Sequence, residues 1–199
     1  MTLEREKRSF MRAQEIRAAE EGGMTISGYA AVFNVRTEIG DGGWKFIEVI
    51  APGAFAAAVT GDVRALIDHD TGRVIGRSSA GTLRLSEDAK GLKVEIDLPD
   101  TTDGRDLQEL VKRGDISGMS FGFMVRKESW DETGAVPVRT IEAVDLYEVS
   151  AVAFPAYDAT TVGIAKRSFN AARRERNHNS ALRRIQRKAE AEAKFRGIA

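Results

Sequence analysis

The chain has 199 residues, enough for one compact domain with a tail, and 42% of them are hydrophobic, which is enough for a buried core. It has no cysteine, which excludes disulfide bonds, thiolate metal sites and a cysteine nucleophile. Its 30 basic and 30 acidic residues balance, the first 17 residues are too charged for a signal peptide, and no apolar run reaches the roughly 20 residues that span a bilayer, so we expect a soluble cytoplasmic protein.

The first part of the chain shows strand patterns separated by turn signals. Residues 8–17 are ambiguous between a short helix and a strand, and strands are predicted at 24–33 and 44–50. A small alanine-rich helix is predicted at 54–59. Residues 63–69 again alternate like a strand, which places four side chains on one face: Val63, Ala65, Ile67 and His69.

The middle of the chain combines further strands with one clear helix. Residues 82–86 and 92–98 are predicted to form a hairpin, and strands are predicted at 117–125 and 141–154. Residues 103–114 begin with acidic side chains, continue to Lys and Arg and stop at a glycine, which is typical of a capped helix. We therefore predict a mainly β protein of the α+β class, a closed or nearly closed β-barrel with helices at its edges.

The last residues differ in charge from the rest. Residues 167–199 carry ten basic and three acidic side chains, a net charge of +7, so the remainder carries −7. Leu182, Ile185 and Ala189 recur at helical spacing, which predicts a solvated amphipathic helix. We divide the chain into a body, residues 1–166, and a basic helical or disordered tail, residues 167–199. Binding of nucleic acid by the tail fits its charge, although Phe169 and Phe195 are its only aromatic residues.

His69 is the single histidine of the body, because the other histidine, His178, lies in the tail. Any mechanism in the body that uses an imidazole must therefore use His69. Its neighbours Asp68 and Asp70 make the end of this strand polar and acidic. An exposed surface histidine is the simpler interpretation of this residue taken alone.

The segment from Ser117 to Met124 is a candidate nucleophile strand. Alternation places Ser120 and Gly122 on one face, while Phe121 and Phe123 fill the core from the other, so the serine is expected to face outward. Gly122 would let a substrate backbone approach Ser120 closely. Ser117, nearer the end of the helix, is the competing nucleophile, and an incidental serine on a glycine-kinked strand is the plain alternative.

Glu148 lies in a nearly apolar strand pattern, residues 143–154. Burial of a carboxylate without a partner is costly, so Glu148 must pair with a cation or with an imidazole. A carboxylate that accepts from an imidazole fixes the tautomer and stabilises the imidazolium formed during acyl transfer. Asp145, on the opposite face, is the weaker candidate.

Other chemistries lack their motifs. The Gly40–Gly43 stretch has no Walker pattern, and two histidines without cysteine give no plausible zinc ligand set. We expect neither a metal nor a cofactor.

Several short motifs occur together in a fixed order and resemble the HK97-type prohead proteases of tailed phages and prophages over residues 7–166. These motifs are Gly28-Tyr29-Ala30-Ala31-Val32-Phe33-Asn34, Ile50-Ala51-Pro52-Gly53-Ala54-Phe55, Asp68-His69-Asp70, Gly118-Met119-Ser120-Phe121-Gly122-Phe123, Leu146-Tyr147-Glu148-Val149-Ser150 and Phe154-Pro155-Ala156-Tyr157.

The resemblance implies a fold related to the herpesvirus assemblin proteases, an antiparallel β-barrel flanked by helices. It implies His69 and Ser120 as the catalytic pair. The herpesvirus proteases use a second histidine, which this body lacks, so Glu148 is the best match for the third member. The oxyanion donors stay open among Arg126, Arg139 and loop amides.

The implied activity is that of a serine endopeptidase inside the assembling prohead, in the host bacterial cytoplasm. Its implied substrates are the scaffold or the scaffold-like segment of the major capsid protein, and the protease itself. A homodimer or higher oligomer is compatible with this function, whereas a membrane partner is not expected. The alternatives are an inactive capsid-assembly module and a nucleic-acid-binding protein that acts through its tail.

Overall fold

The computed structural model describes residues 5–9, 16–19, 23–41, 44–153 and 159–195. By their internal contacts the residues fall into two units, Met1–Val162 and Gly163–Ala199, and each is described by itself. The candidate site lies entirely in the first unit.

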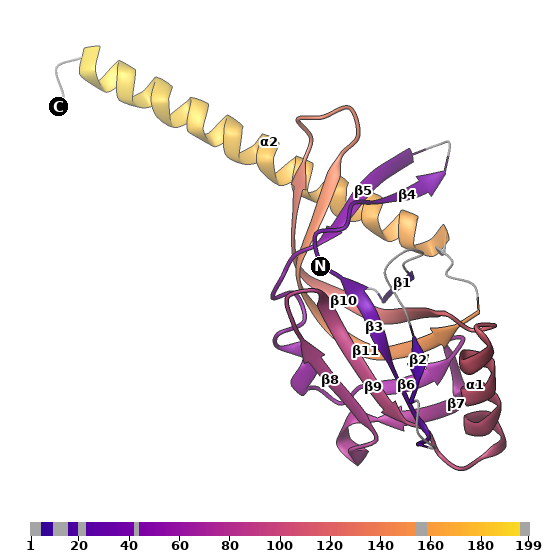
Figure 1. The fold of residues 1–199 in the computed structure, drawn as a ribbon. Coiled ribbons are helices and arrows are strands. Elements are labelled where there is room, and N and C mark those ends of the chain that lie inside the picture. The colour runs from indigo at the N-terminus through magenta and orange to yellow at the C-terminus, as the bar shows by residue number, and fades with distance from the viewer. Residues whose placement is uncertain (1–4, 10–15, 20–22, 42–43, 154–158, 196–199) are drawn as a thin grey trace. The chain divides into compact units, whose positions relative to one another are not determined.

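The described strands of the first unit form two sheets (Figure 1). The larger follows the order β1 (Glu6–Ser9), β10 (Gly118–Asp131), β11 (Val138–Val152), β5 (Trp44–Ile50) and β4 (Thr37–Asp41), and β6 (Arg64–Ile67) joins it through β11 and pairs with β7 (Asp70–Arg77). The smaller follows the order β2 (Arg17–Ala18), β3 (Thr25–Val32), β9 (Gly91–Asp97) and β8 (Leu83–Glu87).

The predicted closed antiparallel barrel is wrong in two respects. The described strands form two separate sheets, and the larger one is mixed, because β11 pairs in parallel with both β5 and β6. The α+β class, with a majority of strands, is confirmed. Strand alternation reports which face is buried but not which distant strand is the partner, so the pairing could not be predicted from the pattern.

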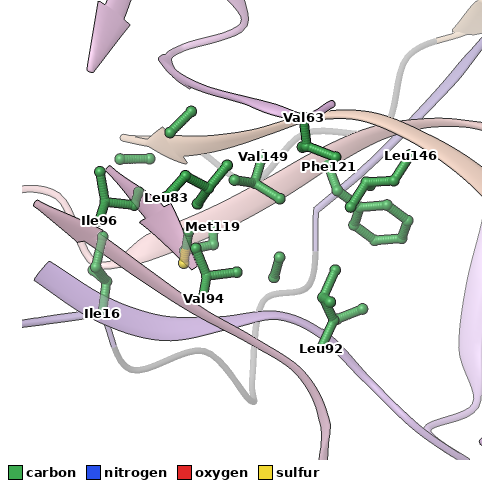
Figure 2. Packing of buried hydrophobic residues seen from close by; sticks show 14 of the residues in the cluster. Ile16, Val63, Leu83, Leu92, Val94, Ile96, Met119, Phe121, Leu146 and Val149 are labelled. Atoms are coloured by element: carbon green, nitrogen blue, oxygen red, sulfur yellow. The ribbon is translucent and has the colours of Figure 1, made fainter. Parts of the chain in front are cut away.

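The core is one hydrophobic cluster that both sheets supply. Figure 2 shows Val94 and Ile96 of β9 near Met119 of β10 and Val149 of β11. Phe121 is fully buried in this cluster and meets Phe55 edge to face. This packing fixes the backbone of β10 and β11, which carry most of the candidate site.

The helix α1 (Thr102–Arg113) confirms the predicted helix at 103–114 within one residue. The side chain of Thr101 accepts a hydrogen bond from the Gly104 amide, and Gly114 ends the helix in the left-handed conformation, with φ of 80°. α1 packs on β2 and β7. The predicted helix at 54–59 is wrong, because this segment forms turns and only the short 3-10 helix η1 (Ala58–Thr60).

Several strands differ from the prediction. β4 and β7 were not predicted, and β10 and β11 form a long hairpin that extends beyond the expected bounds. The ambiguous segment 8–17 ends one strand and begins another, and its residues 10–15 lie outside the described part. A second short 3-10 helix, η2 (Ser78–Ala80), follows β7.

The second unit consists of most of the long helix α2 (Ala159–Phe195), and its side chains from residue 173 to residue 191 are all exposed. Among the described helices, none combines the length and the apolar composition needed to cross a bilayer.

Candidate active site

His69 lies in a tight turn that the neighbouring strand holds. Asp68 and His69 form the two-residue connection between β6 and β7, and both have left-handed backbone angles, with φ of 48° and 61°. Such angles at both positions belong to the hairpin turn that matches strand twist, and they are uncommon for residues other than glycine. The Asp68 amide donates to the carbonyl of Ala151 at 3.0 Å, and Asp68 Oδ1 accepts from the amide of Ala153 at 3.2 Å. β11 therefore fixes the turn that presents the imidazole.

The imidazole of His69 meets the carboxylate of Glu148. His69 Nδ1 lies 2.7 Å from Glu148 Oε1, and the two side chains are only 16% and 13% exposed. A carboxylate can only accept, so Nδ1 is assigned as the donor. This assignment leaves Nε2 as the basic nitrogen, which is the tautomer that a general base requires.

Ser150 completes this arrangement and was not assigned a role from the sequence. Its Oγ donates to Glu148 Oε2 at 2.6 Å and accepts from the backbone amide of His69 at 3.2 Å. One hydroxyl therefore ties the carboxylate to the turn that carries the histidine. The spacing of Glu148 and Ser150, two residues apart on one strand, is the sequence signal that could have indicated the contact.

Ser120 lies on the same sheet face as these groups. In the antiparallel pair of β10 and β11, Ser120 is opposite Ser150 and Gly122 is opposite Glu148, and directly opposed residues share a face. Ser120 is fully buried, however, and its Oγ donates to the carbonyl of Arg8 at 2.8 Å. Within the described residues, no hydrogen bond joins Ser120 to His69. The serine expected to face outward is thus buried, and its hydroxyl is bonded to β1, which pairs with β10 at this position.

Gly122 has a different role from the one that its sequence suggested. A Cβ on Gly122 would lie 2.4 Å from Glu148 Oε1, so the absent side chain makes room for the carboxylate of Glu148. The glycine therefore shapes the pocket for the partner of His69.

The weaker candidates are placed elsewhere. Ser117 is exposed in the connection between α1 and β10. Asp145 pairs with Arg126 in a half-exposed ion pair. Arg139 is buried and bound to three carboxylates, those of Glu6, Glu48 and Glu128. Both arginines considered as oxyanion donors are therefore engaged in ion pairs.

A pocket of about 280 Å³ opens beside the histidine turn. Its lining comes from the ends of β6 and β11, from Arg73 of β7, from α1 and from the segment after α1. In the part of the chain that the structure describes, no three His, Asp or Glu side chains gather as a metal site.

Comparisons with known proteins agree on one family. Residues 12–175 match the family described as caudovirus prohead serine protease. The chain is 32% identical over 160 residues to the prohead protease of Enterobacteria phage HK97, covering 76% of this chain and 65% of that protein. It is also 32% identical over 101 residues to the prohead protease of Escherichia phage T5, covering 51% of this chain and 45% of that protein. The chain thus spans about half to two thirds of these relatives.

The fold has a counterpart among solved structures. The capsid assembly protease of bacteriophage T4 superimposes with a TM-score of 0.50, at 13% identity, over 76% of this chain and 99% of the other. At that identity the similarity concerns the fold. The sequence match, which spans most of the chain, carries the assignment: the chain belongs to the caudovirus prohead serine protease family.

Proposed function

We propose that this chain is a serine endopeptidase of prohead maturation, which cleaves the scaffold or the scaffold-like segment of the major capsid protein and also cleaves itself. The observation that carries the proposal is the 2.7 Å contact between His69 Nδ1 and Glu148 Oε1, on the sheet face that also bears Ser120. Family membership supports a peptidase that acts in capsid assembly.

Each of the three residues has a role in acyl transfer. His69 Nε2 takes the proton of the Ser120 hydroxyl while Oγ attacks the scissile carbonyl carbon, and an acyl-enzyme forms. The imidazolium then gives this proton to the leaving amine. Glu148 orients the ring and stabilises its positive charge, and the Ser150 hydroxyl donates a hydrogen bond to the other carboxylate oxygen of Glu148. Water, activated by the same imidazole, releases the acyl group.

The hydrogen bond from Ser120 to Arg8 marks a resting arrangement. Its hydroxyl proton points to a backbone carbonyl of β1 and must turn toward His69 before attack. Rotation about the Cα–Cβ bond of Ser120, with a local shift of β1, would provide this change. We infer that such a rearrangement accompanies activation inside the prohead.

The test is co-expression with the capsid protein of the same phage, followed by intact-mass measurement of both proteins. The wild type should shorten the capsid protein, and Ser120→Ala and His69→Ala should abolish processing. Glu148→Gln should reduce the rate by up to about 10⁴-fold, the effect of the wrong tautomer in another serine protease. Ser117→Ala is the matched control and should process normally. Unchanged processing in Ser120→Ala or His69→Ala would refute the proposal.

The second candidate is an assembly module without protease activity, which the bond of Ser120 to Arg8 instead of His69 favours. The same experiment separates the two. An inactive module would leave the capsid protein and this chain at full mass in the wild type, while the wild type and Ser120→Ala would co-purify equally with capsid protein.

A further inference from the structure

The pocket beside the histidine turn is in position to take part in substrate binding. Asp68, which precedes His69, is part of its lining, as is Ile67 of β6. The lining also includes Leu107 and Leu110 of α1 and Ile116 just before β10. The pocket therefore touches both segments that carry the proposed catalytic pair.

The strand register places the pocket near Ser120 along the sheet but on the core face, because its residue Ile67 is opposite Ala151, whereas Ser120 is opposite Ser150 on the other face. Ala153 is a lining residue and follows Ser150, the residue opposite Ser120, by three positions. At about 3.3 Å per strand residue, this separation is roughly 10 Å along the sheet. An extended peptide covers the same distance in about three residues. A substrate bound at Ser120 that continues past the end of β11 can thus turn a side chain around this end of the sheet into the pocket, within about three residues of the scissile bond.

The lining combines apolar walls with acidic groups. Ile67, Leu107 and Ile116 are buried hydrophobic residues. Asp106 on α1 and Asp115 after it are exposed, and both line the pocket together with Asp68. Asp115 has a partner in the exposed Arg113, at 3.0 Å.

The single cation of the lining is already engaged. Arg73 Nη2 and Nε lie 3.1 and 3.3 Å from the two carboxylate oxygens of Asp103. This hydrogen bonding is the main reason that the pKa of Arg73 is raised. Because Asp103 balances Arg73, the remaining lining is acidic.

We propose that this pocket is a substrate subsite that selects a Lys or Arg side chain within three residues of the cleaved bond. The methylene stem would lie on the apolar wall and the cationic end would meet Asp106 and Asp115, as long basic side chains do at apolar surfaces with a polar rim. This inference rests on the proposed protease function and specifies its substrate class.

The test uses the full-length protein and a peptide library from a bacterial proteome cut after glutamate, so that Lys and Arg stay internal. Cleavage sites that Ser120→Ala does not produce are identified by mass spectrometry. The wild type should show enrichment of Lys or Arg at one position within three residues of the cut. In Asp106→Asn/Asp115→Asn this enrichment should fall by about two- to fivefold, as expected for contacts with exposed charges. Cleavage at sites without basic residues should not change.

Two further variants sharpen the result. Asp106→Lys should move the preference toward Asp and Glu at the same position. Glu109→Gln removes a negative charge from an exposed position of α1 outside the pocket lining and should leave the preference unchanged.

The outcomes separate the two proposals. If the wild type and Ser120→Ala give the same cleavage sites, the proposed protease function is refuted, and the subsite is refuted with it. If the wild type cuts without a basic preference, or if the double variant keeps the full preference, the subsite is refuted while the protease function stands.

Discussion

The carboxylate of Glu148 occupies the space that a side chain at position 122 would fill. In Gly122→Ala the new Cβ would collide with Oε1, so the carboxylate must move away from His69 Nδ1. A displacement of about 1 Å in a catalytic group costs about 10²-fold in rate. We therefore expect Gly122→Ala to lower kcat for peptide cleavage by about this factor while the variant still folds, as checked by circular dichroism.

Gly134→Ala is the control for this prediction. It lies in the turn between β10 and β11, and the nearest atom to its new Cβ would be the Val136 carbonyl oxygen at 3.7 Å, an ordinary contact. It should therefore retain normal kcat. Equal activity of the two variants would mean that the position of Glu148 does not limit the reaction.

Ser150 is a positioning residue, since it acts through Glu148 and the turn of His69. Ser150→Ala removes both hydrogen bonds without adding bulk. We expect kcat to fall by about tenfold or more with little change in KM, because the orientation of the base is lost while substrate binding is retained. Steady-state kinetics with a fluorogenic peptide measure this split. A rise in KM alone would instead place Ser150 in substrate binding.

At the scale of elements, a buried ionic cluster fixes β1 to the larger sheet. Glu6 and Arg8 of β1, Glu48 of β5 and Arg139 of β11 are all buried. Arg139 Nη1 lies 2.9 Å from Glu6 Oε2 and 3.1 Å from Glu48 Oε2. Arg8, bound to the same two carboxylates, supplies the carbonyl that holds Ser120. The cluster thus sets the register of β1 against the proposed nucleophile.

Removal of one cation from this cluster should be strongly destabilising. Arg139→Met removes a hydrogen-bond donor from Glu6 and Glu48, which stay buried. Breaking a buried ion pair in this way costs about 3–5 kcal/mol in free energy of unfolding. Arg105→Met removes an exposed partner of Asp100 instead and should cost less than about 1 kcal/mol. Urea unfolding of the two variants gives the comparison. Similar losses in both would contradict the energetic role of burial.

The cluster also predicts how stability depends on pH. Burial by itself would raise the pKa of Glu6, but the hydrogen bond from Arg139 and the charges of Arg8 and Arg139 lower it below 4.5. A carboxyl group whose pKa is lower in the folded than in the unfolded chain stabilises the fold at pH values above the unfolded pKa. This stabilisation is lost as the pH falls through the folded pKa. The stability advantage of the wild type over Glu6→Gln should therefore be full at pH 6 and shrink below about pH 4.5. A constant difference across this range would contradict the assignment.

Local signals predicted elements better than they predicted pairing. The helix at 103–114 was predictable because its cap, charge order and terminal glycine all lie within the helix itself. The strand β7 was not predictable, because Gly72 and Gly76 in its sequence are typical of turns. Only its pairing with β6 makes this segment a strand. The need of Glu148 for a partner followed from its apolar strand, whereas the bond of Ser120 to Arg8 depends on a strand 112 residues away.

At the scale of the whole chain, the two units differ in how they are stabilised. The first has a hydrophobic core with both sheets, whereas the side chains of α2 from residue 173 to residue 191 are exposed. Helices without packing gain little stability from their backbone alone. We therefore expect the exposed segment 173–191 to contribute little to the stability of the chain.

Truncation after Ala172 tests this view, because it keeps the buried residues Ala165 and Phe169 and removes only the segment that follows. We expect the Tm of the remaining chain to stay within about 2 °C of the full-length value, since loss of exposed helix removes almost no buried apolar area. Differential scanning calorimetry measures the shift. Phe169→Ala in the full chain is the comparison, and we expect it to cost about 3–5 kcal/mol in free energy of unfolding because the ring is buried. If the truncation lowered Tm more than Phe169→Ala does, the exposed part of α2 would stabilise the fold by more than its small buried area indicates.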